Sequence, residues 1–388
     1  MGKRLAKSDF TKQDTQALKG IAILMMLFHH CYRTTEIFEG YTVNFAPFSE
    51  DFIVKLAYFM KICVAIFVFI TGYGLTKSIK AQSENYTLDR QQFKGYIRTR
   101  LVKVMSGYWF VYICASIFCF FMDNRQLTVY FEGDITRDNF ATGFMRMLLD
   151  MFGLTRLFNL NYWRYTLNAD WWYMSLAILL VLLAPLIVRL VHKYAFLWTA
   201  LLCLFVPRIF GLDGSNDLVR WIFMFIIGVY SAQNDVLQKM KDFCFVKNRP
   251  LNMLLKFGLS TVILAVLCYT ATKLDHKAFY EFKDGMVPFF VIYYCYNFII
   301  CIPVVRQILC FFGRYAMTVY FVHDIIKEVY FGDFVYSFEY FGLIYIIFFA
   351  ISLAVAIVLE FLKKITGYNK LINLIVQKLS VKSAVSSV

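Results

Sequence analysis

Two titratable residues, Lys19 and His30, bracket an otherwise apolar segment, KGIAILMMLFHH. On an α-helix this spacing makes about three turns, so both side chains fall on one face, about 16 Å apart along the axis. Ionisable residues are costly in hydrocarbon and usually face a bundle interior or a water-filled path. The spacing therefore predicts a polar track across a membrane. His29 is rotated by about 100° from His30, so we expect it to pack or to support its neighbour.

A basic cluster, Arg98, Arg100 and Lys103, stands at the start of a later apolar segment, in the sequence RTRLVK. Arginine forks bind phosphate well, so a cluster at the inner membrane edge could hold the phosphates of a cytoplasmic cofactor. The alternative is that these residues only anchor a helix at the cytoplasmic surface. The residue types alone favour the anchor.

Asp170, Trp172 and His323 could act at the opposite membrane surface. Asp170 precedes an apolar run in NADWWYMS and could orient an acceptor or cap the helix, with capping favoured. An aromatic belt at the interface is sufficient to explain Trp172. His323 follows Tyr320 by about one turn, so a hydrogen-bonded cluster is feasible. A histidine satisfied by a neighbouring helix is the alternative.

The composition places these residues in a membrane protein. Hydrophobic residues make up 60% of the chain and charged residues 17%, whereas soluble domains are about 45–50% apolar. The ten cysteines lie mostly in or beside apolar runs without metal-type spacing, which indicates small apolar residues rather than ligands. The net charge of +14 is explained by cytoplasmic loops that face anionic lipid, without nucleic acid as a partner.

Ten apolar segments of spanning or near-spanning length predict an all-α membrane bundle. Their approximate limits are 16–33, 52–75, 101–122, 171–191, 195–210, 218–233, 252–272, 286–304, 308–331 and 341–362. The fifth and sixth are short, which leaves a re-entrant pair open. The distribution of Lys and Arg among the connections predicts that both termini are cytoplasmic. Residues 1–365 are expected to form a single membrane domain and 366–388 a short cytoplasmic tail.

The longest predicted outside connection runs from Asp123 to Asp170. Its apolar residues have mixed helical spacing and are interspersed with charged residues, which predicts an amphipathic element over the extracellular mouth. We expect this connection to act as a lid or as an acceptor-binding surface.

These motifs, in this order, resemble the integral membrane acyltransferase 3 family, whose members include O-acetyltransferases of surface glycans. Lys19 and His30 look like its [R/K]-x10-H motif, and FVFITGYGL resembles FFxxSGF, with Thr71 in the serine position. RTR is similar to its cytoplasmic RxR motif. DWWYMS resembles xxWFLS, with Asp170 where histidine is common, and FGRYAMTVYFVH is similar to GKxSYxxYLxH, which places His323.

The resemblance implies transfer of an acetyl or other short acyl group from cytoplasmic acyl-CoA to a hydroxyl group. Arg98 and Arg100 would bind the phosphates of the co-substrate, with Lys103 beside them. His30 would accept the proton of the attacking hydroxyl as a general base. Lys19 would orient the donor or compensate charge on the thioester oxygen. No metal is expected.

The acceptor implied by the resemblance is an extracytoplasmic or lipid-linked glycan at a bacterial-type plasma membrane. We expect Asp170, Trp172 and His323 to lie on the acceptor side; the oligomeric state is not indicated. The principal alternative is a secondary transporter or exporter, although the sequence lacks an evident inverted repeat or paired broken helices. Binding of acetyl-CoA would separate the two classes.

Overall fold

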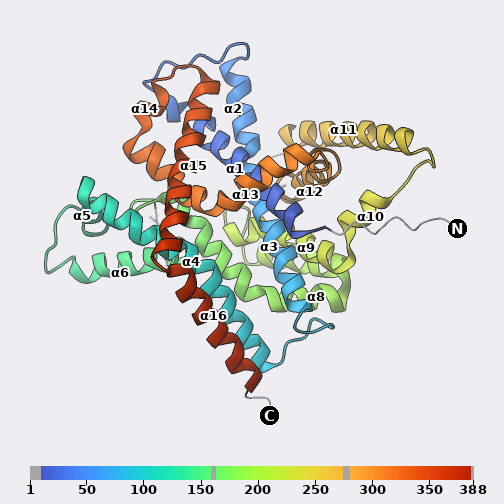
Figure 1. Ribbon diagram of the computed structural model, residues 1–388, viewed down its shortest axis with the longest axis horizontal. Helices are drawn as coiled ribbons and strands as arrows, with labels where there is room; N and C mark the ends of the chain where they lie inside the picture. Colours follow the sequence, from blue (N-terminus) through green and yellow to red (C-terminus); the bar gives the residue numbers. More distant parts are fainter. Residues whose placement is uncertain (1–9, 159–162, 274–279, 386–388) are drawn as a thin grey trace. The chain divides into compact units, whose positions relative to one another are not determined.

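The computed structural model describes residues 10–158, 163–273 and 280–385. Within these ranges the regular structure is helical, as the sequence predicts (Figure 1), and the β contact is an isolated bridge between Asn44 and Tyr340. An all-helical fold satisfies the backbone hydrogen-bonding groups inside each segment, which a bilayer requires.

The helices are named in chain order. The α-helices are α1 (Lys12–Tyr32), α2 (Glu50–Phe59), α3 (Cys63–Lys80), α4 (Arg90–Met122), α5 (Arg125–Phe131), α6 (Phe140–Met151), α7 (Thr155–Phe158), α8 (Trp172–Ile209), α9 (Asp217–Asn234), α10 (Val236–Asp242), α11 (Arg249–Lys273), α12 (Val287–Tyr294), α13 (Pro303–Asp324), α14 (Gly332–Tyr336), α15 (Phe341–Ile365) and α16 (Tyr368–Val385). The 3₁₀ turns are η1 (Thr35–Phe38), η2 (Met60–Ile62) and η3 (Ala169–Trp171), and the π-helical turns are η4 (Phe282–Met286), η5 (Cys295–Ile299) and η6 (Ile325–Tyr330).

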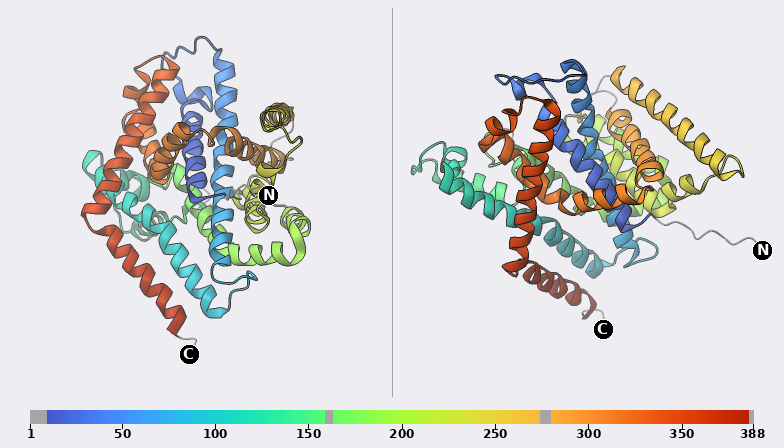
Figure 2. Two further views of the ribbon diagram at one scale, coloured as in Figure 1. Left: turned by 45° about the vertical axis from the view of Figure 1, so that its right-hand side comes forward. Right: turned by 45° about the horizontal axis from the view of Figure 1, so that its top comes forward.

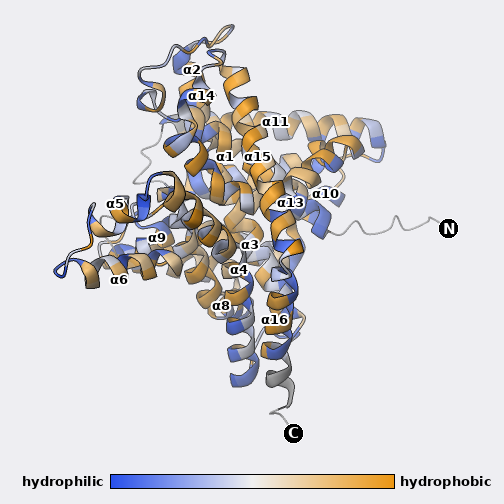
Figure 3. Ribbon diagram, turned by 60° about the vertical axis from the view of Figure 1, so that its left-hand side comes forward, coloured by the Kyte–Doolittle hydropathy of each residue, from blue (hydrophilic) through white to orange (hydrophobic). Residues whose placement is uncertain are grey.

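Five helical stretches in the described part of the chain are long and apolar enough to cross a membrane. They are Glu50–Lys80, Arg90–Met122, Ala169–Ile209, Arg249–Ala271 and Phe341–Ile365. Figure 3 shows apolar residues along the helices and hydrophilic residues gathered at helix ends and in connections. The predicted all-α membrane bundle is confirmed at this level. The count of ten spans and the cytoplasmic position of both termini stay predictions.

The predicted fourth and fifth segments form one element, α8, with a break between them. Ala195 has non-helical angles of φ 63° and ψ 170°, which a residue with a Cβ atom adopts rarely. The break lies at the boundary of segment 195–210 as predicted.

The chain divides into two compact units, each built from distant stretches of sequence. Unit 1 holds the residues up to Met26, Phe59–Leu88 and Leu183–Arg314. Unit 2 holds Leu27–Tyr58, Asp89–Leu182 and the residues from Tyr315 onward. The boundary at 365/366 between membrane domain and tail stays a prediction.

Unit 1 is centred on the close packing of α3 against α9. A Cβ atom on Gly72 would lie 2.5 Å from the carbonyl oxygen of Phe225, and one on Gly228 would lie 2.4 Å from that of Phe69. Glycine at both positions therefore lets the two backbones touch. Gly72 therefore has a packing role, and α3 continues through it without a break.

Unit 2 contains α16 lying along α4, as both views of Figure 2 show. The Tyr368 hydroxyl donates to the carbonyl oxygen of Ser106 at 2.8 Å, and its ring lies 5.0 Å from that of Phe110. Within the predicted tail, residues 368–385 thus form a helix that packs along α4.

The long connection between α4 and α8 in unit 2 folds into α5, α6, α7 and η3. Helix α6 is amphipathic as predicted, with Phe140, Phe144 and Met145 exposed and Asp150 buried. Asp150 joins this connection together, because its carboxylate accepts hydrogen bonds from Tyr130, Thr155, Thr166 and the Leu167 amide.

Candidate active site

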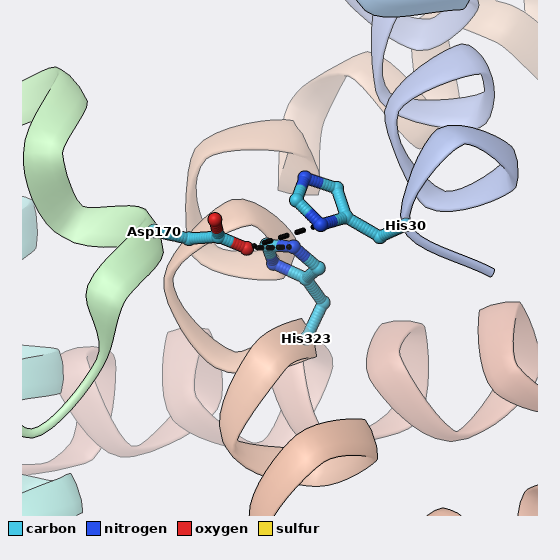
Figure 4. Close-up of side chains that lie close together, drawn as sticks. All are labelled: His30, Asp170 and His323. Atoms are coloured by element: carbon cyan, nitrogen blue, oxygen red, sulfur yellow. Dashed lines mark ion pairs between the residues drawn. The ribbon is translucent and has the colours of Figure 1, made fainter. Parts of the chain in front are cut away.

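Three predicted site residues lie close together in unit 2, and each is located at the end of a different helical element. His30 lies in the last turn of α1, Asp170 in η3 directly before α8, and His323 at the end of α13. The π-helical turn η6 follows α13 immediately, and such turns are frequent at functional sites. Figure 4 shows the three side chains pointing toward one another.

Asp170 lies between the two imidazole rings. Its Oδ2 atom is 3.2 Å from Nδ1 of His30 and 3.1 Å from Nε2 of His323. The rings themselves are 4.7 Å apart between centroids. All three residues are buried, with His323 at 0% exposure. A buried carboxylate needs a compensating partner, and here the partners are two groups that can carry protons.

The hydrogen-bond partners of His323 set its protonation. Its Nδ1 lies 2.7 Å from the carbonyl oxygen of Tyr320, so Nδ1 must carry a proton, because a carbonyl only accepts. In the described residues, neither Nε2 of His323 nor Oδ2 of Asp170 has a hydrogen-bond partner, although the two atoms are 3.1 Å apart. A proton on Nε2 is the arrangement that makes this contact attractive.

His30 has a different environment because Arg33 lies beside it. Arg33 Nη1 donates to His30 Nδ1 at 3.3 Å when that nitrogen carries no proton, and Asp170 Oδ2 lies 3.2 Å from the same nitrogen. In the other tautomer the proton on Nδ1 faces the carboxylate, and Nε2 of the neutral ring has a free lone pair. The adjacent guanidinium disfavours a second proton on His30. This geometry suits a general base oriented by a carboxylate.

A second layer of hydrogen bonds fixes Asp170 against α13. The Asn168 side chain accepts from the Asp170 amide at 2.8 Å and so caps η3. Trp171 Nε1 and Asn168 Nδ2 both donate to the carbonyl oxygen of Phe321, at 3.0 and 3.3 Å. The Tyr320 hydroxyl donates to the carbonyl oxygen of Asp170. The capping role favoured for Asp170 is therefore wrong: Asn168 supplies the cap, which frees the Asp170 carboxylate for the histidines.

The same three side chains form a possible metal ligand set. One ligand atom from each of His30, Asp170 and His323 lies within 4.8 Å of the other two. Two imidazoles and a carboxylate with an open position are a combination that binds zinc in catalytic sites. The arrangement thus supports either proton transfer or metal coordination by chemistry alone.

The predicted donor-side residues lie along α4, outside this cluster. Arg98 and Lys103 are exposed and Arg100 is half-buried, with its guanidinium 5.8 Å from the ring centroid of Tyr96. The Tyr96 hydroxyl is buried and has no hydrogen-bond partner among the described residues. A basic group beside an unsatisfied buried hydroxyl is a suitable place for a polar ligand.

The remaining predicted residues are not brought into the cluster. Lys19 is half-buried on α1 and belongs to unit 1, and α1 is unbroken from Lys19 to His30. Trp172 is half-buried and packs on Tyr173. Its neighbour Trp171 makes the hydrogen bond to α13 instead. His29 is held by its Nδ1 contact with the Ala57 carbonyl at 2.7 Å, which agrees with the predicted supporting role.

A family model described as an acyltransferase domain matches residues 14–361, which include all three cluster residues. The chain belongs to the acyltransferase 3 family. Membership of this family, together with the apolar helices, identifies a membrane acyltransferase. Comparisons with curated proteins and with solved structures found no match.

Sequence reasoning about this acyltransferase missed Asn168, Trp171 and Arg33. Asn168 carried a usable signal, because asparagine shortly before an apolar helix is a strong N-cap. An aromatic belt at the membrane interface would explain Trp171 and Trp172 equally well. Only the direction of each side chain in the fold shows which of them contacts α13. Arg33 could be counted as a surface charge until the fold placed it beside His30.

Proposed function

We propose that this acyltransferase moves an acetyl or other short acyl group from cytoplasmic acyl-CoA to a hydroxyl of an extracytoplasmic or lipid-linked glycan in a bacterial-type plasma membrane. The observation that carries the proposal is the distance of 3.2 Å between His30 Nδ1 and Asp170 Oδ2. With its proton on Nδ1 facing the carboxylate, the imidazole can accept a proton at Nε2, which acyl transfer to a hydroxyl requires.

The transfer step needs one proton carrier. The acceptor hydroxyl gives its proton to Nε2 of His30 while its oxygen bonds to the thioester carbonyl carbon. The carbon–sulfur bond then breaks, and the CoA thiolate takes the proton back from His30. Asp170 stabilises the intermediate imidazolium without becoming protonated itself. The ring ends the cycle neutral and ready for another hydroxyl.

His323 keeps the Asp170 carboxylate in place during this step. As an imidazolium, His323 balances the negative charge of the buried Asp170 carboxylate. Without a positive partner, a buried carboxylate would take up a proton and become neutral. Nδ1 of His323 donates to the Tyr320 carbonyl, and Nε2 of the same ring lies 3.1 Å from Asp170 Oδ2. His323 acts through Asp170 as a positioning residue.

The donor is assigned to the basic end of α4. Arg98 and Arg100 would bind the CoA phosphates, with Lys103 as a further cation. Tyr108, on the same helix, packs against Trp171 and Phe321 with ring centroids 5.2 and 5.5 Å apart. Tyr108 follows Arg98 by ten positions, which is about 15 Å along the helix axis. The flexible pantetheine arm of CoA would cover this separation.

The roles of Lys19, on the donor side, and of Trp172, on the acceptor side, follow from the predicted side of the membrane. Lys19 is proposed to orient the donor or to compensate charge on the thioester oxygen. Trp172 and the connection from Asp123 to Asp170 are proposed to contact the glycan, since exposed aromatic rings of α6 and its neighbours lie there.

The experiment is an acyl-transfer assay with radiolabelled acetyl-CoA and membranes that contain the full chain. We expect label in hydroxyl-linked, alkali-labile esters of glycan or lipid-linked saccharide, with one free CoA thiol released per ester. Release of CoA without labelled ester, or no use of acetyl-CoA, would contradict the proposal. A transporter would move its substrate unaltered and would release no CoA thiol.

The donor assignment is tested separately by binding. The Arg98→Ala/Arg100→Ala variant should lose most affinity of the purified protein for acetyl-CoA. A matched control, Arg90→Ala/Lys94→Ala, removes two cations from the first turns of the same helix and should bind as the wild type does. Equal loss in both variants would mean a general effect of charge, not a phosphate site.

A further inference from the structure

Unit 1 carries a cavity that the acyl-transfer proposal does not use. It has a volume of about 350 Å³ and lies among α10, α11, α12 and the connection after α10; Figure 1 shows these helices next to one another. Its apolar lining includes Phe243, Phe245, Leu259 and Ile263. Lys239 and Lys256 also line the cavity.

The charge of Lys256 has an unusual environment. The residue is only 4% exposed, and its Nζ donates to the carbonyl oxygens of Met240 and Lys241 at 3.2 and 2.6 Å. No carboxylate of the described residues lies within ion-pair distance of this Nζ. Buried ammonium groups are costly without a counter-charge. The contacts hold Lys256 at the cavity with its charge only partly compensated.

The surrounding segment is strongly basic. Residues 236–256 contain five basic residues and one acidic residue: Lys239, Lys241, Lys247, Arg249 and Lys256 against Asp242. This end of α11 is cytoplasmic on the predicted topology. Clusters of this size at the cytoplasmic end of a membrane helix attract anionic lipid headgroups.

Helix α11, which supplies part of the cavity lining, also has an exposed apolar face. Helix α11 packs against α12 and leaves a row of apolar side chains open, with Leu254 67% and Val262 61% exposed. Since α11 is one of the helices long and apolar enough to span, this open face suits hydrocarbon. Phe243 and Phe245 are also exposed at the cavity, at 56% and 49%.

We propose that this cavity binds an anionic phospholipid of the cytoplasmic leaflet. Lys239 and Lys256 contact the phosphate, and Phe245, Leu259 and Ile263 hold the upper part of an acyl chain. Both halves of the ligand are required: a soluble anion would leave the apolar lining exposed, and a neutral lipid would leave the Lys256 charge uncompensated. The site is independent of the proposed acyl transfer.

The test uses the purified full-length protein in neutral detergent, with phosphatidylglycerol and phosphatidylcholine of identical acyl chains as probes. Thermal unfolding should shift upward with phosphatidylglycerol and much less with phosphatidylcholine. Lys239→Gln should weaken the apparent affinity for phosphatidylglycerol about fivefold, since one basic residue near the surface contributes about 1 kcal/mol. Lys247→Gln, an exposed lysine of the same connection that does not line the cavity, is the control and should bind as the wild type.

The apolar half is tested by filling it. Leu259→Trp should remove most of the phosphatidylglycerol shift, whereas Leu254→Trp, on the same helix but outside the cavity lining, should leave it intact. Equal shifts by the two lipids, or equal weakening in the cavity and control variants, would overturn the proposal. A thermal shift by acetyl-CoA that Lys239→Gln removes would also overturn it, because the cavity would then be a donor site.

Discussion

Two buried aspartates of unit 2, Asp150 and Asp170, have opposite surroundings. Asp150 accepts four hydrogen bonds from groups that do not change charge near neutral pH, at 2.6 Å from Tyr130 and 2.7 Å from Thr166 at the shortest. Asp170 Oδ2 lies 3.2 and 3.1 Å from two imidazole nitrogens and has no hydrogen-bond partner in the described chain. The first set of contacts fixes a fold, and the second leaves protons free to move.

The difference between the two aspartates shows how a buried carboxylate can remain available to a catalytic histidine. Saturating both oxygens with neutral donors, as at Asp150, stabilises a single arrangement of α5, α6 and the segment before η3. At Asp170 the neighbouring donors are used for the main chain instead, through Asn168, Trp171 and Tyr320. The position of Asp170 is therefore secured by its backbone, and its side chain remains available to His30.

The largest expected contrast is between Asp170→Asn and Asp150→Asn. Asp170→Asn should lower the transfer rate by about 10³-fold or more with little change in thermal stability, because the amide no longer orients the imidazole of His30. Asp150→Asn should instead lower stability by about 2–4 kcal/mol, because some of the four buried donors lose their acceptor. The measurements are acyl transfer and thermal unfolding of both purified variants. Similar changes in transfer rate and in stability for the two variants would contradict the distinction between a catalytic and a structural aspartate.

His323→Gln should have the next largest effect. The variant loses the imidazole nitrogen 3.1 Å from the Asp170 carboxylate, and we expect a cost of about 1.5–3 kcal/mol, as for a polar partner of a charged group, or roughly ten- to a hundredfold in rate. Acyl transfer with saturating acetyl-CoA measures it, and the affinity for acetyl-CoA should not change. A selective loss of donor affinity would place His323 on the donor side and contradict its role through Asp170.

The pH dependence of stability should report Asp150. Burial raises the pKa of Asp150 to about 6, and the hydrogen bonds that it accepts limit the increase. Because the folded-state pKa is above the ordinary value of about 4, the folded state favours the protonated form. Its contribution is fully present below pH 4 and is lost as pH rises to about 6. The stability of the wild type relative to Asp150→Asn should therefore fall by about 3 kcal/mol over this range and stay level above pH 7. A constant difference between the two proteins from pH 4 to 7 would contradict this.

Tyr320→Phe should have a small effect. The variant loses the hydroxyl that donates to the main-chain oxygen of Asp170, a hydrogen bond of about 1 kcal/mol, or about fivefold in rate. Tyr173→Phe, a change of the same chemistry in a tyrosine that packs on Tyr320, is the control. Equal rates for Tyr320→Phe and the wild type would show that the backbone position of Asp170 does not depend on this bond.

Chelation should have no effect if protons, not metal, occupy the cluster. Treatment of the purified protein with EDTA or phenanthroline should leave the transfer rate unchanged, and elemental analysis should find less than stoichiometric zinc. Loss of activity that zinc restores would show that His30, Asp170 and His323 are metal ligands and would remove His30 as the base.

Local chemistry in the sequence indicated the site residues but not how they meet. Two signals indicated the site residues His30, Asp170 and His323. Apolar segments seldom contain titratable residues, and the order of these three resembles a family pattern. Their contact depends on packing between positions some 150 residues apart, for which one sequence has no short-range signal. The helices were predictable from apolar length alone, whereas the unusual backbone at Ala195 and the choice of Trp171 over Trp172 depend on three-dimensional context.

The direct test of the central claim compares His30→Ala with His29→Ala in the acyl-transfer assay. These neighbours share a helix turn, but His29 contacts the Ala57 carbonyl and His30 contacts Asp170. The account predicts that His30→Ala abolishes ester formation while it remains folded in the membrane and binds acetyl-CoA, and that His29→Ala retains most activity. Ester formation by His30→Ala at a rate near that of the wild type would contradict it.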